Sequence, residues 1–147
     1  MHVMRVEENT MAPALSKLNE EYSSVKRAIL QALAAIRSDH FEDYFDCFTE
    51  DAVWMMPSKN HDVHIDEAKK FYGFTKNFRF DQETTVEELI VERDVAIVRV
   101  SFNGFLRSKR DEKAPPLKSV SRHIWIMRHC PDGVWRISRD IWNNPKT

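Results

Sequence analysis

The stretch PDGVWRISRDIWNNP, residues 131–145, joins a turn to a strand and decides the fold. The Pro-Asp-Gly sequence at its start is typical of a tight connection, and aromatic and β-branched residues follow it. Turn residues also separate the other strand-like runs of the second half of the chain, which cover residues 84–92, 94–106 and 117–129. Consecutive strands joined in this way predict an antiparallel sheet.

Helical patterns fill most of the first half of the chain. Apolar residues recur at steps of three and four between Leu15 and Ile36, which predicts an amphipathic helix. A second, shorter helix follows Asp39, and helical spacing returns over residues 66–78, after a short strand at residues 52–56. Helices followed by a run of strands indicate an α+β domain, in which a curved antiparallel sheet wraps around three helices.

The length and composition indicate one globular domain. The chain has 147 residues, of which residues 15–147 are expected to form the domain and residues 1–14, which lack any period, a mobile leader. Its 22 basic and 23 acidic residues form no long block of one sign, so we expect no nucleic-acid partner. No apolar run reaches transmembrane length, so no membrane partner is expected either.

The cysteines, glycines and histidines limit the cellular compartment, cofactors and metals that we expect for this chain. Cys47 and Cys130 are far apart, lack metal-type spacing and occur without a secretory segment, which favours reduced thiols in the cytoplasm. The three glycines form no phosphate-binding motif, which argues against a nucleotide cofactor. His61, His64 and Asp66 only superficially resemble a metal motif, because the segment is a loop. The catalytic H-E-x-x-H motif needs a helix and a glutamate, which are missing here. We therefore expect no metal and no cofactor.

A set of motifs in fixed order resembles a known family. The motifs are DHF at residues 39–41, FTEDAVWMMP at 48–57, EAKKFY at 67–72, DGVWRI at 132–137 and DIWN at 140–143. Together they are similar to the SnoaL-like branch of the nuclear-transport-factor-2-like superfamily, which also contains ketosteroid isomerase and polyketide cyclases. The resemblance covers residues 17–145. It implies a cystatin-like, cone-shaped α+β fold that is usually a homodimer through the convex face of the sheet.

The resemblance does not carry the isomerase mechanism with it. Ketosteroid isomerase uses an aspartate base before the proline that ends the first strand, with a tyrosine and a protonated aspartate as oxyanion donors. The corresponding positions here hold Met56, Ala32 and Arg122. Steroid isomerisation by that mechanism is therefore not expected.

Strand alternation suggests which residues of the last strand face a pocket. Trp135 and Ile137 share one parity, whereas Asp140 and Trp142 share the other. All four can face inward only if a β-bulge lies between Ile137 and Asp140. On this assumption Trp142 faces the pocket, and the resemblance implies that Trp54 and Met56 face it too. The pocket walls are therefore expected to include Trp54, Met56, Tyr72 and Trp142.

Asp140 is the first candidate for chemistry, because a carboxylate among apolar groups requires a partner. With Arg122 on the more aliphatic face of its strand, we expect an ion pair between the two. That pair would keep Asp140 ionised, which favours a structural or ligand-anchoring role, with Arg122 stabilising negative charge. If Arg122 turns away, Asp140 is better suited to abstract a proton.

His123 is the second candidate, because histidine carries protons near neutral pH. It lies on the face opposite Arg122, so it is expected on the outer surface unless the register slips by one residue. Ser121 is expected to point away from this histidine, which argues against a serine nucleophile. Contacts of the convex face with a second copy are expected from Trp125, Met127, Arg99 and Ser101.

Two functions remain open at this stage. The first is an enzyme that isomerises, cyclises or dehydrates an apolar carbonyl compound by cofactor-independent acid–base chemistry, with Asp140, Arg122 and His123 as its catalytic candidates. The second is a non-catalytic module of the same fold that binds a small apolar molecule or associates as a dimer. The residues do not identify a substrate.

Overall fold

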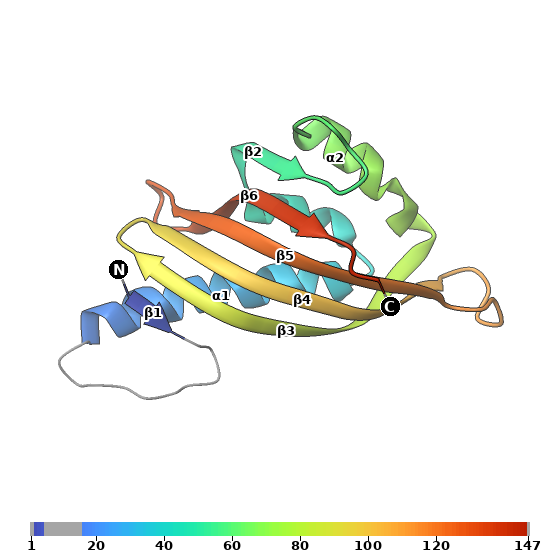
Figure 1. Cartoon of the computed structure of the whole chain (residues 1–147), viewed down its shortest axis with the longest axis horizontal. Helices are drawn as coiled ribbons and strands as arrows, with labels where there is room; N and C mark the ends of the chain where they lie inside the picture. Colours follow the sequence, from blue (N-terminus) through green and yellow to red (C-terminus); the bar gives the residue numbers. More distant parts are fainter. Residues whose placement is uncertain (1, 5–15, 147) are drawn as a thin grey trace.

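The computed structural model describes residues 2–4 and 16–146. A curved six-stranded sheet has the order β1-β3-β4-β5-β6-β2, and α1 crosses its concave face (Figure 1). The helical elements are α1 (Ser16–Arg37), η2 (Phe41–Cys47), α2 (Ile65–Phe71) and η3 (Tyr72–Lys76). The strands are β1 (His2–Met4), β2 (Phe48–Met55), β3 (Phe78–Glu92), β4 (Val95–Ser108), β5 (Leu117–His129) and β6 (Trp135–Asn143). All neighbouring strands are antiparallel except β2 and β6.

The predicted α+β fold is confirmed, and α1 shows why the sequence specifies it. Its buried residues Val25, Ile29, Ala32, Leu33 and Ile36 are spaced by four, three, one and three positions, so they form one apolar stripe. This stripe packs against the concave face of the sheet, where α1 contacts β3 and β6. The first helix therefore fixes the curvature of the sheet around a common core.

Some predicted boundaries differ from the structure. The helix expected over residues 66–78 is an α-helix that ends at Phe71 and a 3-10 segment that ends at Lys76. Strand β3 then begins at Phe78, six residues before the expected start, because residues 78–83 already alternate between half-buried and exposed. Of the expected leader, His2–Met4 pair with β3, and residues 5–14 lie outside the described residues.

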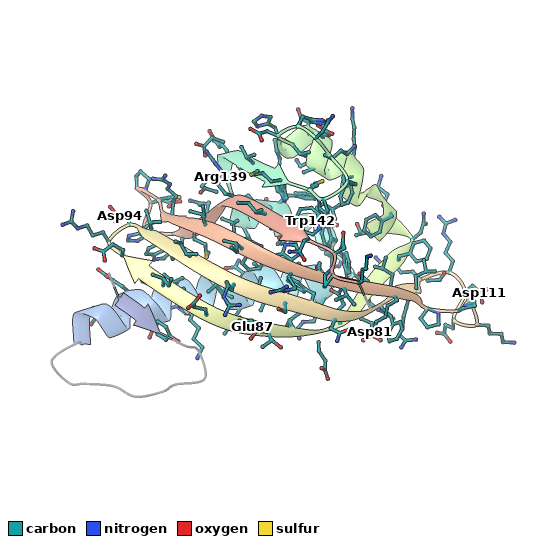
Figure 2. The ribbon with its side chains drawn as sticks, viewed as in Figure 1. Asp81, Glu87, Asp94, Asp111, Arg139 and Trp142 are labelled. Carbon is teal, nitrogen blue, oxygen red and sulfur yellow. The ribbon has the colours of Figure 1, made fainter. Side chains whose placement is uncertain are left out.

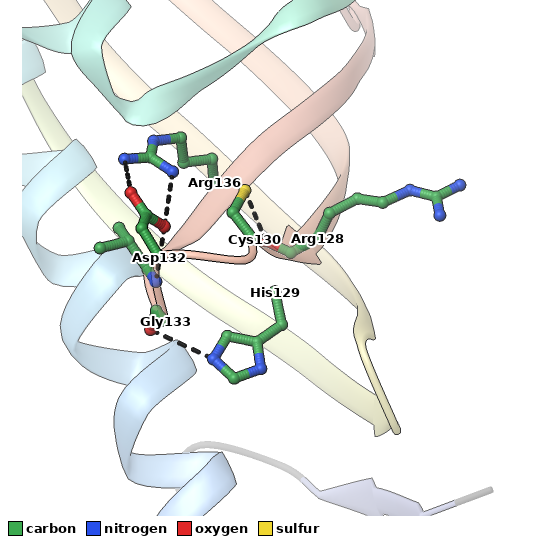
Figure 3. A network of polar contacts seen from close by, with 7 residues as sticks. Arg128, His129, Cys130, Asp132, Gly133 and Arg136 are labelled. Carbon is green, nitrogen blue, oxygen red and sulfur yellow. Dashed lines mark hydrogen bonds and ion pairs between the residues drawn. The ribbon is translucent and has the colours of Figure 1, made fainter.

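The connection between β5 and β6 sets the geometry of the last strand (Figure 3). Gly133 has a φ of 83°, which glycine adopts without steric cost, and its N–H donates to the Cys130 carbonyl at 2.9 Å. Asp132 accepts two hydrogen bonds from the Arg136 guanidinium, at 3.1 and 2.7 Å. Beyond this turn, the β5–β6 register shifts at Ser138, because Met127 pairs with Ile137 whereas Ile126 pairs with Arg139.

This shift is the β-bulge that the sequence predicted, and it turns the strand so that residues on both sides of the bulge face inward. Trp135, Ile137 and Asp140 are all buried, and Trp142 packs against the core. The bulge residue, Ser138, donates a hydrogen bond from its hydroxyl to the Ile126 carbonyl at 3.1 Å. The last strand therefore delivers an aspartate to the interior.

The predicted outer face of β5 requires correction. Trp125 and Met127 are 0% and 1% exposed, so they belong to the core and not to the convex surface. Their neighbours on β4 also alternate, with Val98, Val100 and Phe102 buried, while Arg99 is exposed and Ser101 lies on the same outer side.

No helix in the described part of the chain is long and apolar enough to cross a membrane.

Candidate functional site

A cavity of about 160 Å³ lies between the concave sheet and the short helical segments. Its aromatic walls include Phe41, Phe71, Phe74, Phe80, Phe102 and Trp142. Figure 2 shows Trp142 near the C-terminal end of β6. A polar strip crosses this wall and includes Gln82, Ser119, Ser121 and His123. No Asp, Glu, Lys or Arg is among the described residues that line the cavity, which suits it to a neutral apolar ligand.

His123 and Asp140 form the polar centre of this site. The Nδ1 atom of His123 lies 2.7 Å from Oδ1 of Asp140, whose side chain is 0% exposed, and the histidine side chain is 9% exposed. The Tyr44 hydroxyl donates a longer hydrogen bond, of 3.4 Å, to Oδ2 of the same carboxylate. A carboxylate that accepts from Nδ1–H fixes the tautomer of the ring and leaves Nε2 as the reactive nitrogen.

Ser121 bonds directly to this histidine, contrary to the sequence prediction. Its Oγ atom lies 2.9 Å from Nε2 of His123. The two residues are two positions apart on β5, and residues at this spacing share a face of a strand. The expectation that they diverge treated them as adjacent residues. Ser121, His123 and Asp140 therefore form a continuous hydrogen-bonded row.

Aromatic rings hold the His123 imidazole in place. Trp142 stacks on it with a centroid distance of 5.0 Å and an interplanar angle of 19°. Phe102 meets the ring edge-on, at 5.0 Å and 75°. Because two rings and two hydrogen bonds restrain the imidazole, its orientation is largely set before any ligand binds.

Two tyrosines add phenol groups to the cavity wall. Burial raises the pKa of Tyr44 well above its usual range, and the nearby negative charge of Asp140 raises it further. Burial, followed by the charge of Asp140, likewise raises the pKa of Tyr72. Both phenols therefore stay protonated at neutral pH and remain hydrogen-bond donors.

Arg122 does not meet Asp140. It is exposed on the outer face of the sheet, where it lines a depression with Arg99, Ile124 and Ile141. Asp140 lies on the inner face, and the partner that the structure gives it at salt-bridge distance is His123. The prediction assigned the aliphatic parity of β5 to the interior, but the strand points Trp125 inward, and Arg122 has the opposite parity.

The four expected wall residues separate into two groups. Tyr72 and Trp142 line the cavity. Trp54 and Met56 point inward, as predicted, but they are 0% and 3% exposed and lie in the core outside the cavity lining. Trp54 stacks on Phe48 of the same strand at a centroid distance of 4.4 Å and meets Phe45 of η2 at 6.4 Å, so it packs β2 against η2.

The loop with His61 and His64 contacts a carboxylate. His61 Nε2 lies 2.9 Å from Glu67 at the exposed start of α2. Among residues 2–4 and 16–146, no three His, Cys, Asp or Glu side chains gather in a metal-type cluster.

The sequence also carried signals that the prediction did not use. Ser119, Ser121 and His123 occupy every second position of β5, which is the pattern of a polar strip on one face of a strand. Tyr44 has the helical spacing of a core residue, and it is buried, but its hydroxyl also reaches Asp140. Only the register between β5 and β6 reveals that these groups converge.

Comparison with solved structures identifies the fold. A ketosteroid isomerase-like protein from Erwinia carotovora atroseptica superposes with a TM-score of 0.75 at 21% identity, over 88% of this chain and 99% of the other. A provisionally named scytalone dehydratase from Novosphingobium aromaticivorans gives 0.70 at 16% identity, over 89% and 88%. An NTF2-like protein of unknown function from Shewanella baltica gives 0.64 at 11% identity, over 95% and 100%.

These identities are low enough that the likeness concerns the fold alone. No protein-family model matches the chain, and no curated protein matches it by sequence. The predicted resemblance to the nuclear-transport-factor-2-like superfamily is confirmed at the level of the fold.

Proposed function

We propose that this chain, which has the nuclear-transport-factor-2-like fold, is a cofactor-independent acid–base enzyme for a neutral, apolar carbonyl compound. The observation that carries the proposal is the contact of 2.7 Å between His123 and the fully buried Asp140, at the wall of an aromatic cavity. A buried carboxylate is costly, and here it fixes one nitrogen of an imidazole that faces the cavity. Isomerisation, cyclisation and dehydration all require such a proton carrier.

In this proposal His123 takes over the catalytic role that the sequence assigned to Asp140. Nε2 removes a proton from the carbon beside the substrate carbonyl, either directly or through the Ser121 hydroxyl. Asp140 holds Nδ1–H and stabilises the imidazolium that forms, so it acts as a positioning residue. The protonated phenol of Tyr72 supplies a hydrogen-bond donor for the developing enolate oxygen, whereas the Tyr44 hydroxyl donates to Asp140.

Proton abstraction is tested with 2-tetralone, a neutral aromatic ketone with acidic protons beside its carbonyl. In deuterated buffer, we expect the wild-type protein to accelerate exchange of these protons, followed by proton NMR. The His123→Gln variant should lose about 100-fold or more of this rate, because general acid–base catalysis contributes about 10²–10⁴. Asp140→Asn should lose less, since the base remains but its orientation is weakened.

His40→Gln is the matched control, because this histidine is exposed and is not among the residues that line the cavity. It should exchange protons at the wild-type rate. An exchange rate no greater than that of free imidazole at equal concentration would contradict the enzyme proposal. If 2-tetralone then still binds, as seen by saturation-transfer NMR, the second reading is favoured, namely a non-catalytic binding module.

The hydrogen bond between Ser121 and His123 favours a second candidate, acyl transfer through Ser121. The row of Ser121, His123 and Asp140 has the order of a serine nucleophile, its base and the group that orients the base. A fluorophosphonate probe tests this function directly, because it labels only an activated serine. Mass spectrometry should locate the label on Ser121, with Ser119→Ala as the control that retains it.

We also propose that two copies associate through the outer face of the sheet. Met55, Ile141 and Ile124 are 49%, 37% and 40% exposed, and they are consecutive partners across β2, β6 and β5. A row of exposed apolar side chains on a sheet is usually covered by a partner. Arg99 and Arg122 lie at the edge of this row and give it a polar rim.

A further inference from the structure

A second polar group lies on the cavity wall, separate from His123. The Gln82 side-chain amide of β3 donates from Nε2 to both the carbonyl oxygen and the hydroxyl oxygen of Ser119 on β5, each at 3.1 Å. Both residues line the cavity, beside Phe80 and Leu106. Because β4 runs between β3 and β5, the Gln82 side chain must cross over a whole strand.

Gly104 makes this crossing possible. The register aligns Gln82 with Gly104 and Gly104 with Ser119, so the glycine occupies the position that the amide crosses. A Cβ atom at residue 104 would lie 2.2 Å from the Asp81 carbonyl oxygen and 2.6 Å from Cα of Gln82. No other residue type fits there without moving the backbone. The bridge between Gln82 and Ser119 is therefore built into the sheet.

The bonds of this bridge determine what it offers to a ligand. The Gln82 amide directs its N–H groups at Ser119, so its Oε1 atom is available as an acceptor. The Ser119 hydroxyl oxygen accepts from Gln82, so its own proton is available to donate. An acceptor and a donor side by side match a hydroxyl group, which can donate and accept at once. Polar groups among aromatic walls gain most when a ligand completes their hydrogen bonds.

The position of the bridge also predicts the length of the ligand. Ser119 and His123 lie four residues apart on the same face of β5, which corresponds to about 13 Å along an extended strand. The floor between them carries the Ser121 side chain, and the opposite wall is aromatic. A ligand that reaches both ends is elongated, flat and neutral.

We propose that Gln82 and Ser119 form a recognition subsite for a hydroxyl group at the end of the substrate remote from the reacting carbonyl. This inference rests on the proposed function and names its substrate class: a flat, neutral aromatic compound with oxygen functions at both ends. Gln82 and Ser119 contribute to affinity and orientation, whereas His123 carries the proton.

The subsite is tested by calorimetric titration of the full chain with two matched probes, 4-hydroxybiphenyl and 4,4′-dihydroxybiphenyl. The wild-type protein should bind the diol about fivefold to tenfold more tightly, since one hydrogen bond contributes about 1 kcal/mol. Gln82→Leu should remove this preference. Because the single phenol can place its hydroxyl at either end of the cavity, its affinity should fall less than that of the diol. Asn103→Leu is the control, because this amide lies on β4 but is exposed on the outer side and bonds to Lys118.

The outcomes separate this inference from the proposed function. If the wild type does not prefer the diol, or if Gln82→Leu keeps the preference, the subsite proposal is overturned. Exchange of 2-tetralone still tests the enzyme proposal in that case, because this ketone has no second oxygen function. The Asn103→Leu control should catalyse that exchange at the wild-type rate, because this residue is exposed and does not line the cavity.

Discussion

At the scale of single residues, the fully buried Asp140 depends on its two partners. The carboxylate is 0% exposed and contacts the His123 imidazole and the Tyr44 hydroxyl. Removing one member of a buried pair leaves the other without compensation, which is more costly than replacing both by apolar groups. Such a pair therefore resists change one residue at a time, whether or not it performs chemistry.

A double-mutant cycle measures this dependence. We expect His123→Leu to lower the free energy of unfolding by about 3 kcal/mol, because it leaves Asp140 buried without its ring partner. His123→Leu combined with Asp140→Leu should be more stable than the single variant. Urea unfolding followed by tryptophan fluorescence gives the four values. Additive losses would mean that the two side chains do not stabilise each other.

The buried phenols predict a fall in stability at alkaline pH. Because the pKa of Tyr44 and of Tyr72 is raised on folding, the folded chain keeps protons that the unfolded chain loses near pH 10. This stabilisation is complete below pH 10 and is lost as the pH rises above it. Tyr44→Phe should make the fall in unfolding free energy between pH 9 and 11 shallower.

Urea unfolding at several pH values, with absorbance at 295 nm to count phenolates, checks this prediction. Tyr22→Phe is the comparison, since burial raises the pKa of this half-buried tyrosine less than that of Tyr44. An unchanged slope in Tyr44→Phe would show that this phenol ionises as easily in the folded chain as in the unfolded one.

At the scale of elements, periodicity predicted each long helix and strand but could not assign every face. The stripe of α1 is apolar on one side only, so its buried face follows from the sequence. Strand β5 is apolar on both sides: Trp125 and Met127 have one parity, Ile124 and Ile126 the other. Because its outer face is also apolar, alternation alone could not decide that His123 points inward and Arg122 outward.

The bulge in β6 shows the opposite case. Aromatic and acidic residues of mixed parity required an extra residue before Asp140, and the register shift at Ser138 supplies it. The contact between His123 and Asp140 was beyond prediction, because it depends on the register between two strands, whereas the shared face of Ser121 and His123 follows from their spacing on β5. A shift of that register by one residue would turn the whole polar strip to the other face.

The close approach of β3 and β4 at Gly104 can be tested by mutation. We expect Gly104→Ala to lower the free energy of unfolding by about 1–3 kcal/mol, because its Cβ would overlap the backbone of β3. Gly73→Ala is the matched control: a Cβ at that position meets nothing within 4 Å, so little change is expected. Equal stability of the two variants in urea unfolding would contradict the close approach of β3 and β4.

At the scale of the whole molecule, the sheet has two faces with different roles. The concave face carries the core, the cavity and the polar strip of β5. The convex face carries Arg99, Arg122 and the exposed isoleucines, and no helix of the described residues covers it (Figure 1). Each strand of the sheet therefore serves both faces, since successive side chains alternate between them.

The proposed association of two copies belongs to this scale. We expect sedimentation velocity to show a wild-type dimer that dissociates on dilution. Ile124→Lys should shift it to a monomer, because a lysine buried in the row of Met55, Ile141 and Ile124 repels the same lysine of the second copy. Leu30→Lys is the control, since Leu30 is 51% exposed on α1, away from the sheet's outer face, and its replacement should leave the dimer intact.

The cavity opens on the concave side, so its chemistry should not depend on this contact. Monomeric Ile124→Lys should therefore still bind 4-hydroxybiphenyl with the affinity of the wild type. A wild-type chain that sediments as a monomer at every concentration would overturn the dimer proposal and leave the cavity untouched. Loss of binding in the monomer would instead show that the second copy supports the β5 strand, whose inner face carries His123 and whose outer face carries Ile124.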